Sequence, residues 1–205
     1  MAKSSFKGLS LIRKDNQKKV VSILKKYGNA SCAQLSSTLN LSNVALYNIM
    51  EDLRQKNIVK AMSDKSTIVG RKPSIYALNE SFGLFAVVDY SSAKIRINVF
   101  DINGENLISE ETDERYILSI DDVYESISIL KSMLKNKKLL GLSLKAICVS
   151  TPGRINKNTG YFWVAAKFKD CANINLHKIF SENFDCAIDV KNDMHVALIG
   201  HKSLI

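Results

Sequence analysis

Asn192 and Asp193 place an amide and a carboxylate side by side, just after the apolar stretch 186–190 where a strand is expected to end. Together these groups can donate hydrogen bonds to adjacent hydroxyls and accept them, which suits a polyol ligand. The alternative is that both residues cap the helix that follows the strand. The pair is a candidate sugar-binding site.

A second carboxylate, Asp89, ends the hydrophobic stretch 84–88 and precedes a short loop that contains Ser91, Ser92 and Ala93. A loop that binds phosphate through its backbone N–H groups needs glycines, because a Cβ atom would block the close approach. This loop contains no glycine. A phosphate-binding loop of this kind is therefore not expected here.

Three helices are expected to position another set of polar residues in the first part of the chain. In 15–27 and 43–53, apolar residues recur at i, i+3, i+4 and i+7, which is typical of one helical face. A short helix at 32–39 and a turn at 40–42 lie between them, which predicts a helix-turn-helix. The expected buried residues of the first and third helices are Val20, Ile23, Leu24, Tyr27, Leu46, Ile49, Met50 and Leu53.

The third helix, which Ser42 can cap, carries polar side chains on its other faces. A helix that reads the major groove needs hydrogen-bonding side chains near its N-terminal end. Asn43 and Asn48 could read adenine edges, and Tyr47 could contact a phosphate or a thymine methyl. The alternative is an ordinary polar surface. We take Ser42, Asn43, Tyr47 and Asn48 as candidate DNA contacts.

Two short strands, 58–62 and 74–79, flank a polar tip at 63–67 and predict a hairpin of the wing type. Arg71 and Lys72 lie on its returning arm, where they could follow phosphates or enter a narrow minor groove. The alternative for two adjacent basic residues is a solvated surface. Both are candidate DNA contacts.

The net charge of +9 is unevenly distributed along the chain. The first 79 residues hold 14 Lys and Arg against four acids, whereas the remaining 126 hold 15 against 16. Such a segregation favours a polyanionic partner for the first part alone. Double-stranded DNA is the expected partner.

The second part of the chain reads as an α/β domain. Three antiparallel strands are expected within 84–111, with a hairpin turn at Asn103-Gly104. Ser119 and Asp122 then predict the start of a helix, whose buried stripe is Val123, Ile127, Leu130 and Leu134. The remaining elements are a strand at 144–150, a helix near 173–183 and a strand at 186–190. The predicted fold class is α+β multi-domain, with one domain at 1–79 and an α/β domain at 80–205.

The chain resembles the transcriptional-repressor branch of the ROK family (repressors, open reading frames, kinases) along nearly its whole length. The matching stretches, in the family's order, are LSNVALYNIMEDLRQKNIV, GRKPSIYALN, VVDYSSAKIRINVFDINGE, VSTPGRINKNTG and VKNDMHVALIG. The resemblance implies a winged helix-turn-helix followed by the first lobe of an actin-like (ribonuclease H-like) α/β domain of the ATPase type, which binds sugar.

The resemblance also assigns roles to single residues. In the family's kinases the first loop is Asp-x-Gly-Gly-Thr, of which only Asp89 is retained here, so ATP-dependent phosphorylation is not expected. This departure implies a chain that is not an enzyme, with no catalytic residues and no cofactor. Asn192 and Asp193 match the family's Asn-Asp pair, whose aspartate contacts the sugar, and Gly153 belongs to the matching Pro-Gly loop. Lys191 replaces the usual glutamate. Ala166-Lys167 stands where the family often has Pro-Asn, which predicts an altered sugar pocket.

The family's second lobe, with its zinc site and most of the dimer surface, would lie beyond Ile205. We expect a sequence-specific DNA-binding repressor of carbohydrate metabolism, or the N-terminal half of one, that a sugar or sugar phosphate relieves and that can act as a homodimer. Two alternatives remain open. One is a ROK-type sugar kinase, and the other is a truncated, constitutive DNA-binding module without effector sensing.

Four widely spaced cysteines, at positions 32, 148, 171 and 186, form no C-x-x-C pair. This spacing argues against a metal site and against a disulfide framework, and it favours buried reduced thiols. The central apolar run, 84–88, is far shorter than the roughly 20 residues of a membrane helix. A cytoplasmic protein without a membrane partner is expected.

Overall fold

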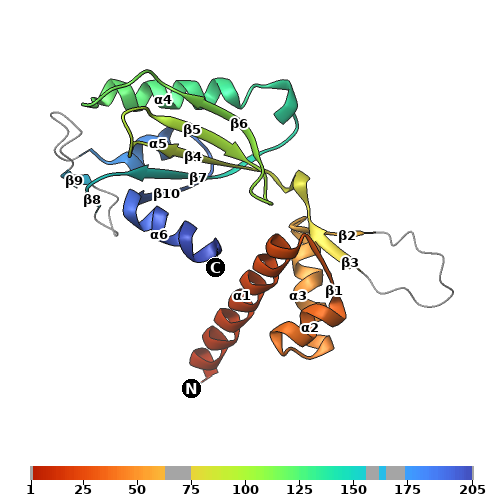
Figure 1. The fold of residues 1–205 in the computed structure, drawn as a ribbon. Coiled ribbons are helices and arrows are strands. Elements are labelled where there is room, and N and C mark those ends of the chain that lie inside the picture. Colours follow the sequence, from red (N-terminus) through yellow and green to blue (C-terminus); the bar gives the residue numbers. More distant parts are fainter. Residues whose placement is uncertain (1, 63–74, 156–161, 165–173, 205) are drawn as a thin grey trace. The chain divides into compact units, whose positions relative to one another are not determined.

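The structure is a computed structural model that describes residues 2–62, 75–155, 162–164 and 174–204 (Figure 1). The chain divides into two compact units, residues 1–82 and 83–205.

The first unit begins with three helices, α1 (Ala2–Tyr27), α2 (Cys32–Leu39) and α3 (Asn43–Gln55). A capping box starts α2: the Ser31 N–H donates to Gln34 Oε1 at 2.8 Å, and the Gln34 N–H donates to Ser31 Oγ at 3.2 Å. The helix ends at Asn40, whose φ of 50° is left-handed, a conformation that asparagine tolerates. The Ser36 hydroxyl then donates to the Leu41 carbonyl at 2.6 Å, which closes the turn into α3. The predicted helix-turn-helix is confirmed.

The apolar faces of α1 and α3 form the core of the first unit. The whole predicted stripe of α3 is buried, and so are Val20 and Leu24 of α1. The prediction for Tyr27 was wrong, because this last residue of α1 leaves 65% of its surface exposed. The ring lies on the last turn of the helix, where the Lys26 ammonium is 5.7 Å from its centroid.

A three-stranded antiparallel sheet in the order β1-β3-β2 completes the first unit. Its strands are β1 (Asn29–Ser31), β2 (Val59–Met62) and β3 (Ile75–Leu78). β2 and β3 are the predicted arms of the wing, and β1 was not predicted. The tip between the arms lies outside the described residues. The one-turn helix η1 (Glu80–Phe82) ends the unit.

The second unit is built on a five-stranded sheet in the order β10-β7-β4-β5-β6. The antiparallel meander of β4 (Leu84–Asp89), β5 (Arg96–Phe100) and β6 (Asn106–Glu111) is confirmed. β7 (Leu144–Thr151) and β10 (Ala187–Asn192) run parallel to β4. β10 extends two residues beyond the predicted strand, because it pairs with β7 as far as Asn192↔Thr151.

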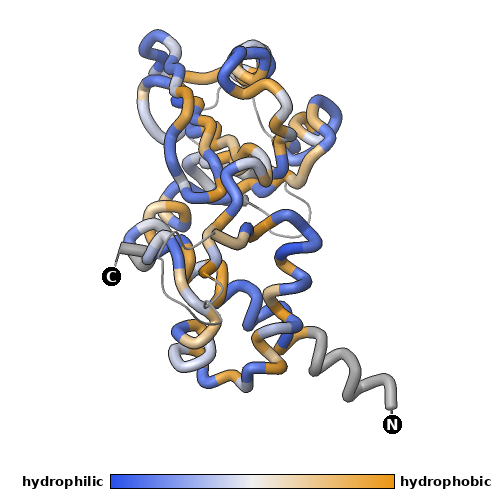
Figure 2. The backbone as a smooth tube through the Cα atoms, turned by 90° about the vertical axis from the view of Figure 1, so that its right-hand side faces the viewer, coloured by the Kyte–Doolittle hydropathy of each residue, from blue (hydrophilic) through white to orange (hydrophobic). Residues whose placement is uncertain are grey.

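Helices cover both faces of this sheet. α4 (Ile120–Met133) and α5 (Leu176–Asn183) share one face, where Val123, Ile127 and Phe180 pack with the buried residues of the strands. α6 (Asp193–Leu204) lies along the other face (Figure 1). Figure 2 shows the hydrophobic stretches of the chain in orange. Met133 extends the buried stripe of α4, whereas the predicted Leu134 is only half-buried. The short helix η2 (Lys137–Leu139) and the hairpin β8 (Arg154–Ile155) and β9 (Phe162–Val164) complete the unit.

The start of α4 depends on the buried Asp122 carboxylate. It accepts from the Ser119 N–H at 2.6 Å and from the Ser119 hydroxyl at 2.8 Å, and it pairs with the Arg115 guanidinium. Burial acts to raise the pKa of Asp122, but the hydrogen bonds from Ser119 and Arg115 outweigh it and lower the pKa. The charged carboxylate therefore stabilises the fold at neutral pH.

We expect Asp122→Ala to destabilise the protein by about 1–3 kcal/mol at pH 7, because three hydrogen bonds to a charged group are lost. The pKa of Asp122 is lower in the folded than in the unfolded state. The stabilisation by its carboxylate is therefore full above the unfolded-state pKa of about 3.9 and is lost as the pH falls through the folded-state pKa. Urea unfolding at pH 7 and at pH 3 measures both effects. Asp121→Ala is the matched control, because Asp121 lies exposed in the same turn. An equal loss in the two variants would contradict the assignment.

Candidate functional site

The N-terminal half of α3 presents its predicted polar residues on one exposed face. Asn43 and Asn48 are exposed, and Tyr47 leaves 65% of its surface in solvent. Val44, which was not predicted, is 72% exposed beside them. The Ser42 hydroxyl accepts from the Ala45 N–H at 3.2 Å, so it is occupied as the cap of the helix. The structure thus brings together two amides, a phenol and an isopropyl group at the start of α3.

The C-terminal half of α3 carries an ion pair of its own. The Arg54 Nε and Nη2 atoms donate to the two Glu51 carboxylate oxygens at 3.1 and 2.9 Å. Gln55 donates to the same carboxylate at 3.1 Å. The hydrogen bonds from Arg54, then Gln55, lower the pKa of Glu51. The charges of Glu51 and Arg54 are therefore paired with each other within the helix.

Asp52 holds α1 against α3. Its carboxylate accepts from Gln17 Nε2 at 3.2 Å and forms an ion pair with Arg13. Because α3 is also anchored by its buried stripe, its exposed face is held on a rigid support. Such support is what a helix needs to present side chains in a fixed register.

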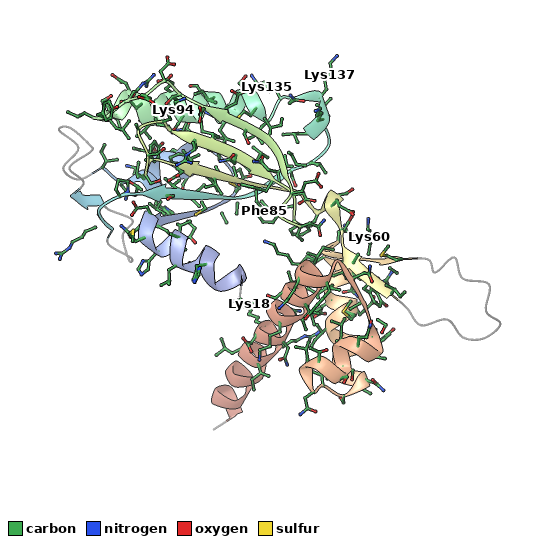
Figure 3. All side chains as sticks on the ribbon, viewed as in Figure 1. Lys18, Lys60, Phe85, Lys94, Lys135 and Lys137 are labelled. Carbon is green, nitrogen blue, oxygen red and sulfur yellow. The ribbon has the colours of Figure 1, made fainter. Side chains whose placement is uncertain are left out.

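Other elements of the first unit also carry basic side chains. Figure 3 labels Lys18 on α1 and Lys60 on β2, of which Lys60 pairs with Glu80 of η1. The predicted contacts Arg71 and Lys72 lie outside the described residues.

The second unit contains a pocket of about 270 Å³ beside α6. It opens on the sheet face opposite α4 and α5, near the ends of β4 and β7. Its polar lining is Asp89, Ser91, Arg96, Asn98, Ser150 and Asp193, and its apolar lining is Val87, Val196 and Ala197. Two carboxylates, a guanidinium group and an amide group therefore line the same pocket.

Arg96 and Asn98 of β5 were not among the predicted site residues. The sequence does contain a signal for them, because Arg96 and Asn98 alternate with the apolar residues Ile97 and Val99, which are fully buried in the structure. In a strand such alternation sends the polar residues to the face opposite the core. Asp89 pairs with Arg96 across the two strands, and their charged groups lie 3.8 Å apart.

The loop after β4 is closed by its own side chains. The Asp89 carboxylate accepts from the Ser91 N–H at 3.0 Å and from the Ser91 hydroxyl at 2.9 Å. The Ser92 hydroxyl donates to the Lys94 carbonyl at 2.7 Å, and the Ala93 carbonyl accepts from the Arg115 N–H at 2.7 Å. The loop is thus held by its own side chains and by one backbone hydrogen bond from Arg115, and both Asp89 oxygens bond to Ser91.

Asn192, Asp193 and Gly153 have separate positions. The Asn192 amide donates to the Gly153 carbonyl at 2.9 Å, and its Oδ1 atom accepts from the Met194 N–H at 3.1 Å. Gly153 has a φ of 105°, which a side chain would disfavour. Asp193 lines the pocket, and its Oδ1 atom also accepts from the Met194 N–H at 2.8 Å. The bond between Asn192 and Gly153 connects the loop after β7 to the start of α6. Lys191 pairs with Asp189 at 2.6 Å.

The three described cysteines, Cys32, Cys148 and Cys186, are free thiols that are only partly buried. Burial raises the pKa of each thiol. Cys171 and the pair Ala166-Lys167 lie outside the described residues. Within the described part of the chain, no group of three or more His, Cys, Asp or Glu side chains could hold a metal ion. In that part, too, no helix combines the length and the apolar character that a membrane crossing requires.

A family model described as "ROK family" matches residues 85–204, which is more than half of the chain. The chain belongs to the ROK family. The matched segment contains the five-stranded sheet except for Leu84, and it contains all of α6.

Two curated relatives are xylose repressors. The chain is 26% identical to the xylose repressor of Staphylococcus xylosus over 140 residues, which cover 66% of this chain and 37% of that protein. It is 23% identical to the xylose repressor of Bacillus spizizenii over 200 residues, which cover 94% of this chain and 50% of that one. The chain thus spans half or less of the length of these relatives.

A solved structure shows the same fold. It is a ROK family transcriptional regulator described as a homolog of the E. coli MLC protein, with a TM-score of 0.69 and 17% identity, covering 89% of this chain and 46% of that one. This likeness confirms the predicted fold class, a winged helix-turn-helix followed by the first lobe of the ROK domain.

Proposed function

We propose that this ROK protein is a DNA-binding transcriptional repressor of carbohydrate metabolism. The observation that carries the proposal is the exposed polar face of α3. The opposite, apolar face of the same helix is buried in the core of the helix-turn-helix unit. The similarity to xylose repressors supports the same conclusion. In the proposed complex the N-terminal half of α3 enters the major groove, and Arg71 and Lys72 follow the adjacent phosphates.

The pocket beside α6 is proposed to hold the sugar or sugar-phosphate effector. The Asp193 and Asp89 carboxylates can accept hydrogen bonds from ligand hydroxyls, and the Asn98 amide can both donate and accept. The effector would then shift the equilibrium between states that bind the operator and states that do not. Phosphoryl transfer is disfavoured, because the loop after Asp89 has Ser91, Ser92 and Ala93 where a phosphate-binding loop has glycines. The two serine side chains form hydrogen bonds within the loop.

Binding of labelled duplex DNA at increasing salt concentration tests the proposed function. We expect affinity to fall steeply with salt, since cationic contacts to phosphates release counterions. A panel of sugars and sugar phosphates added to the complex then tests the effector. Failure to bind any duplex at low salt would overturn the repressor proposal. Micromolar binding of Mg-ATP together with sugar turnover would favour the kinase instead, and a complex that no sugar releases would favour a constitutive module.

We expect Asp193→Asn to raise the effector concentration that releases the operator by about tenfold or more, because a hydrogen bond to a charged group is lost. Affinity for DNA without effector should stay unchanged. Asp189→Asn is the matched control, since Asp189 lies exposed on β10 and pairs with Lys191. Equal effects of the two substitutions would remove Asp193 from the effector site.

A further inference from the structure

The part of α3 that would enter the groove carries no charge. Its first eight residues, Asn43 to Met50, include no Lys, Arg, Asp or Glu. The exposed members are Asn43 and Tyr47, one helical turn apart, and Val44 and Asn48, also one turn apart. Any base readout by this half of the helix therefore depends on amides, a phenol and an isopropyl group.

The single basic residue of α3 is held away from such a role. Arg54 uses its Nε and Nη2 donors on the Glu51 carboxylate, and the hydrogen bonds from Arg54 lower the pKa of Glu51. Guanine is most often recognised by Arg or Lys that donates to its O6 and N7 atoms. Glu51, which could accept from the cytosine amino group, is engaged in the same pair. Asp52, the third charged residue of α3, is bonded to Gln17 and Arg13. All charged side chains of the helix are thus engaged with other protein groups.

The remaining groups match A·T pairs. An asparagine amide can donate to adenine N7 and accept from the adenine N6 amino group, and an apolar side chain can contact the thymine methyl. Because Val44 and Asn48 are adjacent on the helix surface, one can meet a thymine methyl while the other binds a neighbouring adenine.

We propose that α3 reads A·T base pairs in the major groove and that the Glu51–Arg54 ion pair prevents the helix from accepting G·C pairs at the same positions. The proposal rests on the DNA-binding function above and names the sequence class that this helix recognises.

Selection of bound duplexes from a randomised pool by the full chain tests this readout. We expect the enriched motif to contain A·T pairs at the positions whose preference changes in Asn48→Ala, and that preference should fall by about five- to 150-fold, the range for one bidentate contact. Glu51→Gln removes the charge that holds Arg54, and we expect it to raise the recovery of G·C pairs next to those positions. Tyr116→Ala is the control, since this exposed tyrosine lies in the second unit.

The possible outcomes separate the readout from the proposed function. Enrichment of G·C pairs at the Asn48-dependent positions would overturn the readout while DNA binding stands. The same would follow if Asn48→Ala and Glu51→Gln left the selected motif unchanged. Failure to retain any duplex at low salt would instead overturn the proposed function itself.

Discussion

Replacing Gly83 by alanine is expected to destabilise the second unit by about 3 kcal/mol or more. Gly83 adopts a φ of +149°, and a Cβ atom there would lie 2.5 Å from the Ser143 carbonyl oxygen. That oxygen belongs to the backbone and accepts from the Leu84 N–H at 2.9 Å. The new atom would therefore displace the contact that aligns the start of β4 with the segment entering β7, and these two strands are central in the sheet.

Urea unfolding followed by circular dichroism measures this loss. Gly141→Ala is the matched control in the same unit, because its φ of +85° is also left-handed but a Cβ atom there would meet nothing within 4 Å. Backbone strain alone should cost the control about 1 kcal/mol. If both variants lost the same amount, the clash with Ser143 would not govern the effect.

The helix-turn-helix and the strand meander were predictable from local pattern. In α3 the apolar spacing alone identifies the buried stripe, because a helix of 13 residues contains nearly two repeats of the i, i+3, i+4, i+7 pattern. Asn103-Gly104 indicates the turn between β5 and β6, and Gly104 does adopt a positive φ of 85°. Such signals involve only residues close together in the sequence, so they can be recognised without knowledge of the tertiary structure.

The composition of the pocket was not predictable in the same way. Arg96 becomes a neighbour of Asp89 only through the register of β4 with β5, and Ser150 joins them through the register of β4 with β7. A shift of one residue in either pairing would send these side chains to the opposite face. Strand β1 was missed for a related reason, since its three residues form a strand only by pairing with β3.

The pair Asn192-Asp193 shows how a motif can divide between two tasks. Both readings, ligand contact and helix capping, were open in the sequence. In the structure both side chains accept from the Met194 N–H at the start of α6, but Asn192 also donates to the Gly153 carbonyl, whereas Asp193 lines the pocket. The division arises because β10 continues through Asn192, so the boundary between strand and helix falls between the two residues.

The loop after β4 depends on Tyr90, whose importance the sequence did not reveal. Its side chain is fully buried in the core of the second unit, and its Oη atom lies 2.6 Å from Ser126 Oγ. The Ser126 hydroxyl donates to the Val123 carbonyl at 2.7 Å, so the Tyr90 hydroxyl is the donor in the shared bond. The ring thus anchors to α4 the loop that contributes Asp89 and Ser91 to the pocket.

We expect Tyr90→Ala to lower the free energy of unfolding by about 3–5 kcal/mol, the usual cost of removing a buried aromatic ring. Tyr90→Phe keeps the ring and loses only the hydroxyl contact, so its cost should be about 1 kcal/mol. Urea titrations at pH 7 compare the two variants. If Tyr90→Ala lost no more than Tyr90→Phe, the ring would not be the anchor of the loop.

We also expect Tyr90→Phe to change how the free energy of unfolding depends on pH in the alkaline range. Burial raises the pKa of Tyr90, so the folded protein keeps this phenol protonated at pH values where the unfolded chain ionises. Its contribution is therefore full below the unfolded tyrosine pKa of about 10 and is lost as pH rises above it, by up to about 1.4 kcal/mol per pH unit. Unfolding free energies measured between pH 9 and 11 should fall less steeply for Tyr90→Phe than for the unsubstituted protein, and parallel curves would show that the Tyr90 phenol ionises equally in both states.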